Sequence, residues 1–279
     1  MKIFKKILKP FYGSGLGSFL PLRLLLDFLL SLRNKNKPIM VGEHKMFLDH
    51  FDSLRLSLHP HEPYETEVIK KIILKGDIVL DIGAHIGYFT LIFAGLVGEN
   101  GQVFAFEPHP ENFVLLKKNI EANGYKNVIL EKKAVLDKNG KAKLFWASSS
   151  GDYSLIKNRG ENFIETETIT LDDYFKDFKN KIDFVKIDVE GVEIEALSGM
   201  RKLLEKNENL KLMIEYSPLR LKRRGIEPLE FIFLLRQYFS NIYFFDEEDK
   251  KMVLWERGLA KTSFGHFTFN LFCENTKGI

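Results

Sequence analysis

The sequence predicts a Rossmann-like α/β fold, built on a mostly parallel seven-stranded sheet with helices on both faces. Short, continuously apolar segments recur along the chain, as is typical of strands buried on both sides. Segments with helical spacing separate these strands, which favours a parallel sheet covered by helices. The 279 residues, 45% of them hydrophobic, are enough for one large domain with a substantial core.

The predicted elements follow one another from residue 46 onward. An extended segment at 46–58 precedes a helix in which Tyr64, Val68 and Ile72 recur at helical spacing and which ends near Gly76. The buried strands are predicted at 78–82, 103–107, 128–131, 183–188 and 210–215. The helices between and after them are predicted at 87–97, 110–123, 192–206 and 228–239.

Two further strands are predicted near the end of the chain, at Ile242–Phe245 and Phe264–Cys273. In the second, Phe269, Leu271 and Cys273 alternate with polar residues. This alternation is typical of an antiparallel strand with one polar face, so we expect it to join the sheet last.

Residues 1–60 form a basic, Leu-rich N-terminal extension, and 61–279 form the predicted α/β domain. Residues 1–45 hold nine Lys and Arg against two acidic residues. The apolar stretch 19–30 is shorter than the roughly 20 residues that span a bilayer. We expect residues 1–38 either to pack on the domain or to make peripheral contact with an anionic membrane surface.

The chain contains a single cysteine, Cys273, which cannot form an internal disulfide. This fits a reducing compartment, so we expect a cytoplasmic protein, held at the membrane if the basic extension contacts lipid. The sequence makes no prediction of the oligomeric state.

The strongest motif is the segment 79–87, VLDIGAHIG, in which a strand runs into a turn of small residues that opens a helix. Glycines let the backbone approach a ligand closely. Some twenty residues later a second strand ends in Glu107-Pro108, which places a carboxylate where it can accept hydrogen bonds from ribose hydroxyls. The two features together predict a nucleoside cofactor.

The turn favours S-adenosylmethionine over NAD. A dinucleotide site needs the spacing G-x-G-x-x-G, so that a pyrophosphate can bind at the helix N-terminus, and this turn lacks it. Asp81 would repel a pyrophosphate but attract a sulfonium and an amino group. We therefore predict an S-adenosylmethionine site formed by Asp81, Gly83, Ala84, His85, Gly87, Glu107 and Pro108.

Acidic residues also follow the later strands. Asp188 and Glu190 come after the strand 183–188, and Glu215 ends the next. Because the carboxyl ends of parallel strands share one edge, these acids should line a methyl-acceptor site beside the cofactor. One of them would act as the base for a hydroxyl acceptor, and the sequence leaves open which.

Lys186 stands inside the same apolar strand and requires a carboxylate partner if it is buried. A structural salt bridge and a catalytic role are both open for it. No metal site is predicted, and His59 and His61, in a Pro-rich loop, are assigned no role.

Four segments together resemble the FkbM methyltransferase family: 81–90, 106–110, 170–174 and 183–191. The resemblance covers roughly residues 60–220 and implies a class I methyltransferase fold. It also implies S-adenosylmethionine as donor and O-methylation of a hydroxyl on a glycan, polyketide or related small metabolite. His85 departs from the family pattern, in which Asn is usual, but keeps a polar hydrogen-bonding group.

Two other functions compete with this one, an RNA methyltransferase and a non-catalytic nucleotide-binding module. The run 220–224 contains four cations and is interpreted either as a clamp for a phosphate or acidic sugar or as a solvated loop. Because no aromatic residues are interleaved with these charges, no nucleic-acid partner is expected. The expected partner is a small-molecule or glycan acceptor.

Overall fold

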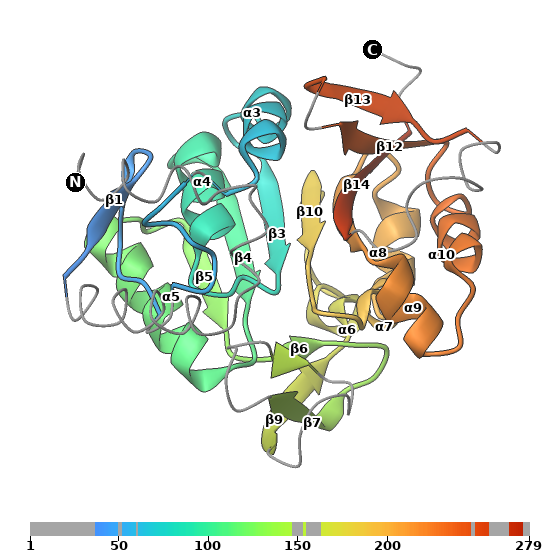
Figure 1. Ribbon diagram of the computed structural model, residues 1–279, viewed down its shortest axis with the longest axis horizontal. Helices are drawn as coiled ribbons and strands as arrows, with labels where there is room; N and C mark the ends of the chain where they lie inside the picture. Colours follow the sequence, from blue (N-terminus) through green and yellow to red (C-terminus); the bar gives the residue numbers. More distant parts are fainter. Residues whose placement is uncertain are drawn as a thin grey trace, which may run out of the picture.

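The computed structural model describes most of the chain from residue 37 onward (Figure 1). The predicted contact of residues 1–38 with a membrane therefore lies almost wholly outside the described residues. Among the residues described, no helix is both long and apolar enough to cross a membrane. The described ranges are 37–49, 52–59, 61–146, 153–154, 163–246, 249–256 and 268–275.

The main sheet contains eight described strands, whereas the sequence predicted seven. Their order across the sheet is β13 (Lys251–Leu254), β12 (Asn241–Asp246), β14 (Phe269–Glu274), β11 (Lys211–Tyr216), β10 (Phe184–Ile187), β3 (Ile78–Ile82), β4 (Gln102–Phe106) and β5 (Val128–Glu131). The five strands from β11 to β5 are parallel to one another. The neighbouring pairs β11–β14, β14–β12 and β12–β13 are antiparallel. The mostly parallel sheet and the antiparallel β14 confirm the predicted class I methyltransferase fold. The additional strand is β13, a short edge strand paired with β12.

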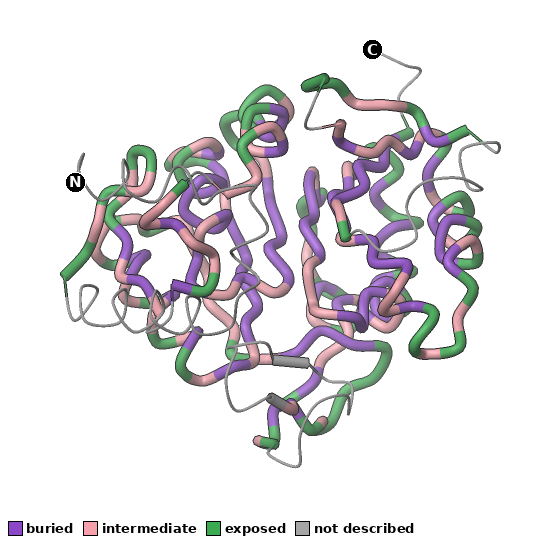
Figure 2. The backbone as a smooth tube through the Cα atoms, in the orientation of Figure 1, coloured by how far each residue is buried: buried purple, intermediate pink, exposed green. Residues whose placement is uncertain are grey.

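Both faces of the sheet are covered, which is why its central strands are buried along their length and mainly apolar (Figure 2). On one face, side chains of α3 (Pro63–Ile72) and α4 (Tyr88–Val97) pack against Val79, Val103 and Phe184. On the other face, α7 (Glu193–Ser198), α8 (Arg201–Lys206) and α10 (Pro228–Leu235) cover the sheet.

The helix predicted at 192–206 is two helices, α7 and α8, separated at Gly199. A Cβ at Gly199 would lie 2.0 Å from the carbonyl oxygen of Leu136. The backbone of the segment after β5 therefore touches the chain between α7 and α8, and the prediction of one continuous helix was wrong. The predicted helix 228–239 likewise ends earlier, at Leu235.

A second sheet, missed by the sequence analysis, lies between β5 and β10 in the chain. It contains β6 (Ala134–Val135), β7 (Gly140–Trp146), β8 (Tyr153–Ser154) and β9 (Phe163–Ile169), in the order β6-β9-β7-β8. Figure 1 shows it set apart from the main sheet, with the short helix α6 (Leu171–Tyr174) leading back towards it. This sheet places Ala134, Val135 and Leu144 beside the site described below.

The described part of the predicted extension packs on the domain. Residues 37–49 contain a hairpin of β1 (Ile39–Val41) and β2 (His44–Met46) beside α5 (Pro110–Asn123). The predicted extended segment 46–58 is therefore wrong beyond its first residues, since 52–59 forms turns. Met46 and Leu56 are buried in one cluster with Ile86 and Leu116. The domain boundary at residue 60 stays a prediction.

Candidate active site

A cavity of about 250 Å³ opens where β3, β4 and β10 end at their carboxyl sides. This is the edge at which ligands bind in open α/β sheets. Six of the predicted site residues line it: Gly83, His85, Glu107, Pro108, Asp188 and Glu190. Five others do not: Asp81, Ala84, Gly87, Lys186 and Glu215. The cavity wall therefore contains both predicted cofactor residues and predicted acceptor residues.

Two glycines of the predicted motif are favoured by their positive φ angles, and Gly83 is required by close packing against backbone as well. Gly83 has a φ of 83°, and a Cβ there would lie 1.8 Å from the carbonyl oxygen of Asp188. Gly87 has a φ of 94°, and a Cβ there would lie 2.7 Å from Cδ1 of Leu116 on α5. Gly83 thus brings the exits of β3 and β10 into contact, whereas Gly87 packs the start of α4 against α5.

Glu107 is 5% exposed and connects the exit of β4 to the turn after β3. Its Oε2 accepts a hydrogen bond from the backbone N–H of His85 at 2.8 Å, and its Oε1 accepts one from the N–H of His109 at 2.9 Å. Burial raises the pKa of Glu107 to about 7. The carboxylate is held in place by the backbone and still faces the cavity.

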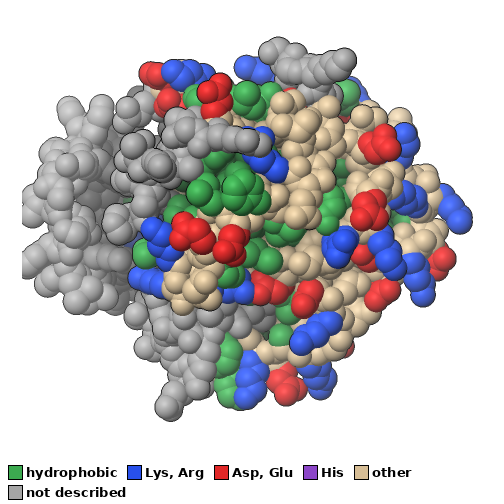
Figure 3. Space-filling view, turned by 90° about the vertical axis from the view of Figure 1, so that its right-hand side faces the viewer, with side chains coloured by type: hydrophobic (Ala, Val, Ile, Leu, Met, Phe, Trp, Pro, Cys, Tyr) green, Lys and Arg blue, Asp and Glu red, His purple; other side chains and the backbone are tan. Residues whose placement is uncertain are grey.

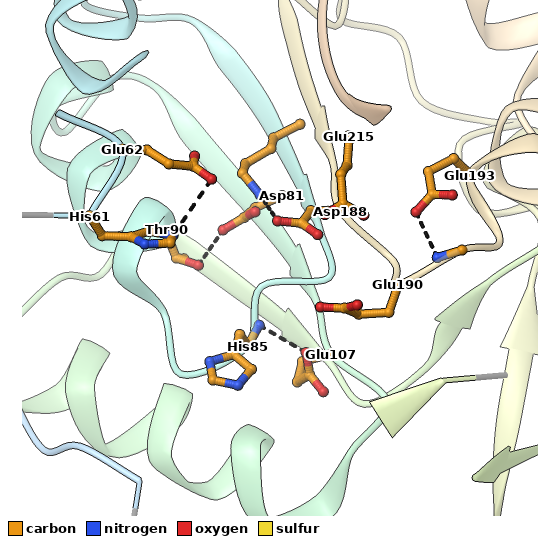
Figure 4. A network of polar contacts seen from close by, with 12 residues as sticks. His61, Glu62, Asp81, His85, Thr90, Glu107, Asp188, Glu190, Glu193 and Glu215 are labelled. Atoms are coloured by element: carbon orange, nitrogen blue, oxygen red, sulfur yellow. Dashed lines mark hydrogen bonds and ion pairs between the residues drawn. The ribbon is translucent and has the colours of Figure 1, made fainter. Parts of the chain in front are cut away.

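Lys186 is buried at the place where the carboxylates of Asp81 and Asp188 lie close to each other (Figure 4). Its Nζ is 2.9 Å from Oδ2 of Asp188, and it pairs across the sheet with Asp81. Burial lowers the pKa of Lys186, but the charges of Asp188 and Asp81 outweigh burial and raise it. Burial likewise opposes ionisation of Asp188, yet the Lys186 ammonium lowers the pKa of that carboxyl below its usual value. Lys186 therefore stays charged, and so does Asp188.

Asp81 is fully buried below the cavity. Its Oδ2 accepts a hydrogen bond from the hydroxyl of Thr90 on α4 at 2.5 Å. Burial raises the pKa of Asp81, and Lys186 opposes this shift. Its second oxygen, Oδ1, has no hydrogen-bond partner among the described residues.

Arg220, on α9 (Pro218–Arg223), joins two of the predicted acids. Its guanidinium forms ion pairs with Glu190, in the loop after β10, and with Glu215, at the end of β11. Burial and the charges of Asp188 and Glu190 raise the pKa of Glu215 well above its usual range, while Arg220 opposes them. The neighbouring Arg224 pairs with Glu195. Two cations of the 220–224 run are thus paired within the protein, and the two interpretations of the run, a clamp and a solvated loop, stay predictions.

Three residues around the site hold a left-handed backbone that side chains other than glycine rarely adopt. The φ angles are 42° at Glu62, 52° at His85 and 56° at Glu190. Such conformations concentrate at functional sites, where the surrounding structure holds them in place. Contacts with the surrounding structure must therefore hold the turn containing His85 and the loop containing Glu190 in these conformations.

The sequence analysis gave His61 no role, but the fold brings it to the site. Its carbonyl accepts a hydrogen bond from Tyr88 at 2.9 Å, and its ring contacts the Tyr88 ring edge to face at 5.3 Å. Burial and the nearby Lys186 lower its pKa to about 4, while Asp188 opposes them. His61 is therefore neutral at pH 7. No local sequence pattern could have shown that His61 lies near Lys186 and Asp188, because this proximity depends on the packing of the loop before α3.

The residues around the cavity fit a nucleoside that carries a sulfonium. The carboxyl group of Glu107 can accept hydrogen bonds from hydroxyls, and Gly83 has no side chain that would keep a ligand away from its backbone. The buried Oδ1 of Asp81, without a partner among the described residues, adds negative potential at the end of β3. Within the described part of the chain, no group of three or more His, Cys, Asp or Glu residues has the arrangement of a metal site.

Comparison with known proteins finds relatives that match part of this chain. Hexuronic acid methyltransferase AglP from Haloferax volcanii is 30% identical over 155 residues, which cover 50% of this chain and 58% of AglP. A protein-L-isoaspartate O-methyltransferase from Methanococcoides burtonii is 43% identical over 56 residues, which cover 20% of this chain and 28% of that enzyme. The chain thus matches less than two thirds of the length of either relative.

A solved structure aligns with a larger share of this chain than these relatives do, but at a lower sequence identity. The crystal structure of a methyltransferase FkbM from Methylobacillus flagellatus aligns with a TM-score of 0.44 and 15% identity, over 92% of this chain and 60% of that one. The profile of the methyltransferase FkbM domain matches residues 81–253, which is more than half of the chain. The protein therefore belongs to the FkbM methyltransferase family, whose methyl donor is S-adenosylmethionine.

Proposed function

We propose that this protein transfers a methyl group from S-adenosylmethionine to an oxygen of a sugar within a glycan. One observation carries the proposal: a single cavity is lined by Glu107 on the side of β4 and by Asp188 and Glu190 on the side of β10. A donor and an acceptor can therefore meet at one edge of the sheet. The partial likeness to a hexuronic acid methyltransferase supports a sugar as the acceptor.

The cofactor would be held by residues at the exits of β3 and β4. The carboxylate of Glu107 would accept hydrogen bonds from the ribose hydroxyls, while Gly83, His85 and Pro108 form the adjoining wall. Asp81, Ala84 and Gly87 do not line the cavity, so they would contribute through the shape of the turn after β3. When bound, S-adenosylmethionine supplies a methyl group on a positively charged sulfur.

The acceptor would lie towards β10 and β11. Asp188 is ionised and faces the cavity, so it can accept the hydrogen bond of an acceptor hydroxyl and orient its oxygen. Lys186 would act as a positioning residue, because its ammonium fixes the carboxylate of Asp188 at 2.9 Å. Glu190 would border the acceptor, and Arg220 holds Glu190 together with Glu215, which does not line the cavity.

Two measurements test the proposal in sequence. Calorimetry with S-adenosylhomocysteine, the product of the donor, tests the cofactor site in the wild type and in Glu107→Ala. We expect the variant to bind at least about tenfold more weakly, because the ribose hydroxyls lose the carboxyl group that accepts their hydrogen bonds. Equal affinity of the two proteins would contradict the assignment of Glu107.

The acceptor is tested with methyl-labelled S-adenosylmethionine and a panel of glycans that contain neutral, uronic and amino sugars, with RNA as a further sample. We expect label in a glycan and none in RNA. In the view of Figure 3, positive and negative side chains are interspersed on the described surface rather than gathered into a basic stripe. Labelled RNA would favour the competing function, and cofactor binding without any transfer would favour a binding module.

A further inference from the structure

Two residues of the cavity wall come from outside the family domain. Ser53 and Leu54 line the cavity together with Glu107 and Asp188, yet they precede the matched region by more than 25 residues. Leu54 is only partly buried. Its side chain therefore meets the cavity on one side and packs with the core cluster of Leu56 on the other.

The loop that carries these residues has a fixed conformation. Asp52, fully buried, accepts hydrogen bonds from the N–H of Leu56 at 2.8 Å and from both the N–H and the hydroxyl of Ser57. The hydroxyl of Ser53 donates to Asp49 at 2.8 Å. These bonds, made within residues 49–57, hold residues 52–57 in a compact turn.

The hairpin ahead of this loop is attached to the cofactor turn itself. The buried side chain of Asn119, on α5, accepts a hydrogen bond from the N–H of Phe47 at 2.7 Å and donates one to its carbonyl at 3.0 Å. The same amide group also donates to the carbonyl of Ile86 at 2.7 Å. The segment 44–47 and the turn 83–87 thus share one anchor, which fixes the N-terminal segment relative to the cavity.

From these contacts we infer that Leu54 is a cofactor-binding residue, presented by the Asp52 turn, and that the cofactor site is completed by residues outside the family domain. The apolar members of the wall, among them Pro108 and Val135, suit the flat face of a nucleoside base, and Leu54 adds to the same apolar lining. This inference rests on the proposed function, because it takes the ligand of the cavity to be S-adenosylmethionine.

Two matched leucine variants of the full chain test the inference. Leu54→Asp places a charge in the cavity wall, whereas Leu58→Asp makes the same change in the same loop at a partly buried residue that does not line the cavity. Calorimetry with S-adenosylhomocysteine gives the affinity, and urea unfolding gives the stability of each variant. We expect Leu54→Asp to bind at least about tenfold more weakly and Leu58→Asp to stay within about twofold of the wild type.

The outcomes separate the two proposals. If the wild type fails to bind S-adenosylhomocysteine, the proposed function is wrong. If the wild type binds and both variants bind equally well, the role of Leu54 is wrong while the proposed function stands. A third variant, Leu54→Ala, covers the case in which Leu54→Asp fails to fold, because it shortens the side chain without adding charge; unchanged affinity of this variant would also overturn the inference.

Discussion

The backbone at Gly83 is in direct contact with the backbone of Asp188, since a Cβ at Gly83 would lie 1.8 Å from the Asp188 carbonyl oxygen. The exits of β3 and β10 can therefore approach each other only if residue 83 has no side chain. The cofactor turn and the acceptor loop are joined at this point.

This contact predicts the effect of Gly83→Ala. We expect the free energy of unfolding to fall by more than about 4 kcal/mol, because the methyl group meets backbone that cannot move aside and φ is 83°. Gly124→Ala is the matched control, since its φ is 74° and nothing lies within 4 Å of the added Cβ. It should lose only about 1 kcal/mol. If urea unfolding gave both variants the same loss of stability, the backbone contact between Gly83 and Asp188 would be contradicted.

Replacement of Lys186 should leave buried carboxylates uncompensated. We expect Lys186→Met to lower the free energy of unfolding by about 3–5 kcal/mol, because Asp188 and Asp81 lose their common counter-ion. Lys141→Met removes an exposed ion pair with Glu165 and should cost under about 1 kcal/mol. The idea fails if urea unfolding gives the two variants the same stability.

The pKa of Glu107 predicts a dependence of stability on pH. Burial raises this pKa from 4.5 to about 7 in the folded protein. Between these values the folded state binds more protons than the unfolded state, so the contribution of Glu107 to stability is present below about pH 4.5 and is lost as pH rises through about 7. From pH 5 to 8 the wild type should therefore lose about 1–3 kcal/mol more than Glu107→Gln does. Parallel pH curves in urea unfolding would contradict this.

The ion pair between Arg220 and Glu215 predicts that loss of the arginine changes the titration of the glutamate. Arg220 opposes the rise in the pKa of Glu215, so Arg220→Gln should raise that pKa further. Carboxyl NMR titration measures the effect directly and needs no acceptor. Arg223→Gln, an exposed change on the same helix, is the control and should leave the titration unchanged. A Glu215 pKa that is the same in both variants would show that the ion pair is absent in solution.

Much of this architecture was predictable because its signals are local. The strands β3, β4 and β10 are buried on both faces, so their sequences are mainly apolar, with Asp81 in β3 and Lys186 in β10 as the charged exceptions. The cofactor turn follows its strand directly, and Glu107 ends the next strand. These features depend on residues close in sequence.

The remaining features depend on contacts between distant segments. In the register of β7 and β9, Lys141 lies opposite Glu167 and Lys143 lies opposite Glu165. The exposed faces of these strands are therefore polar, and no apolar run in the sequence marks them. The ion pairs of Arg220 reach 30 residues back to Glu190, and His61 reaches the site only through the packing of its loop. Gly87 belongs to the motif, but its neighbour is Leu116 of α5 rather than the cavity.

The anchor formed by Asn119 has a thermodynamic consequence. One amide group bonds both to Phe47 and to Ile86, so any ligand that orders the turn at Ile86 also favours the docked hairpin. Linkage makes this relation reciprocal: a change that loosens residues 44–47 weakens the binding of the ligand by the same free energy. Amide hydrogen exchange in the hairpin would therefore slow when the site fills, although none of the hairpin residues 39–46 lines the cavity.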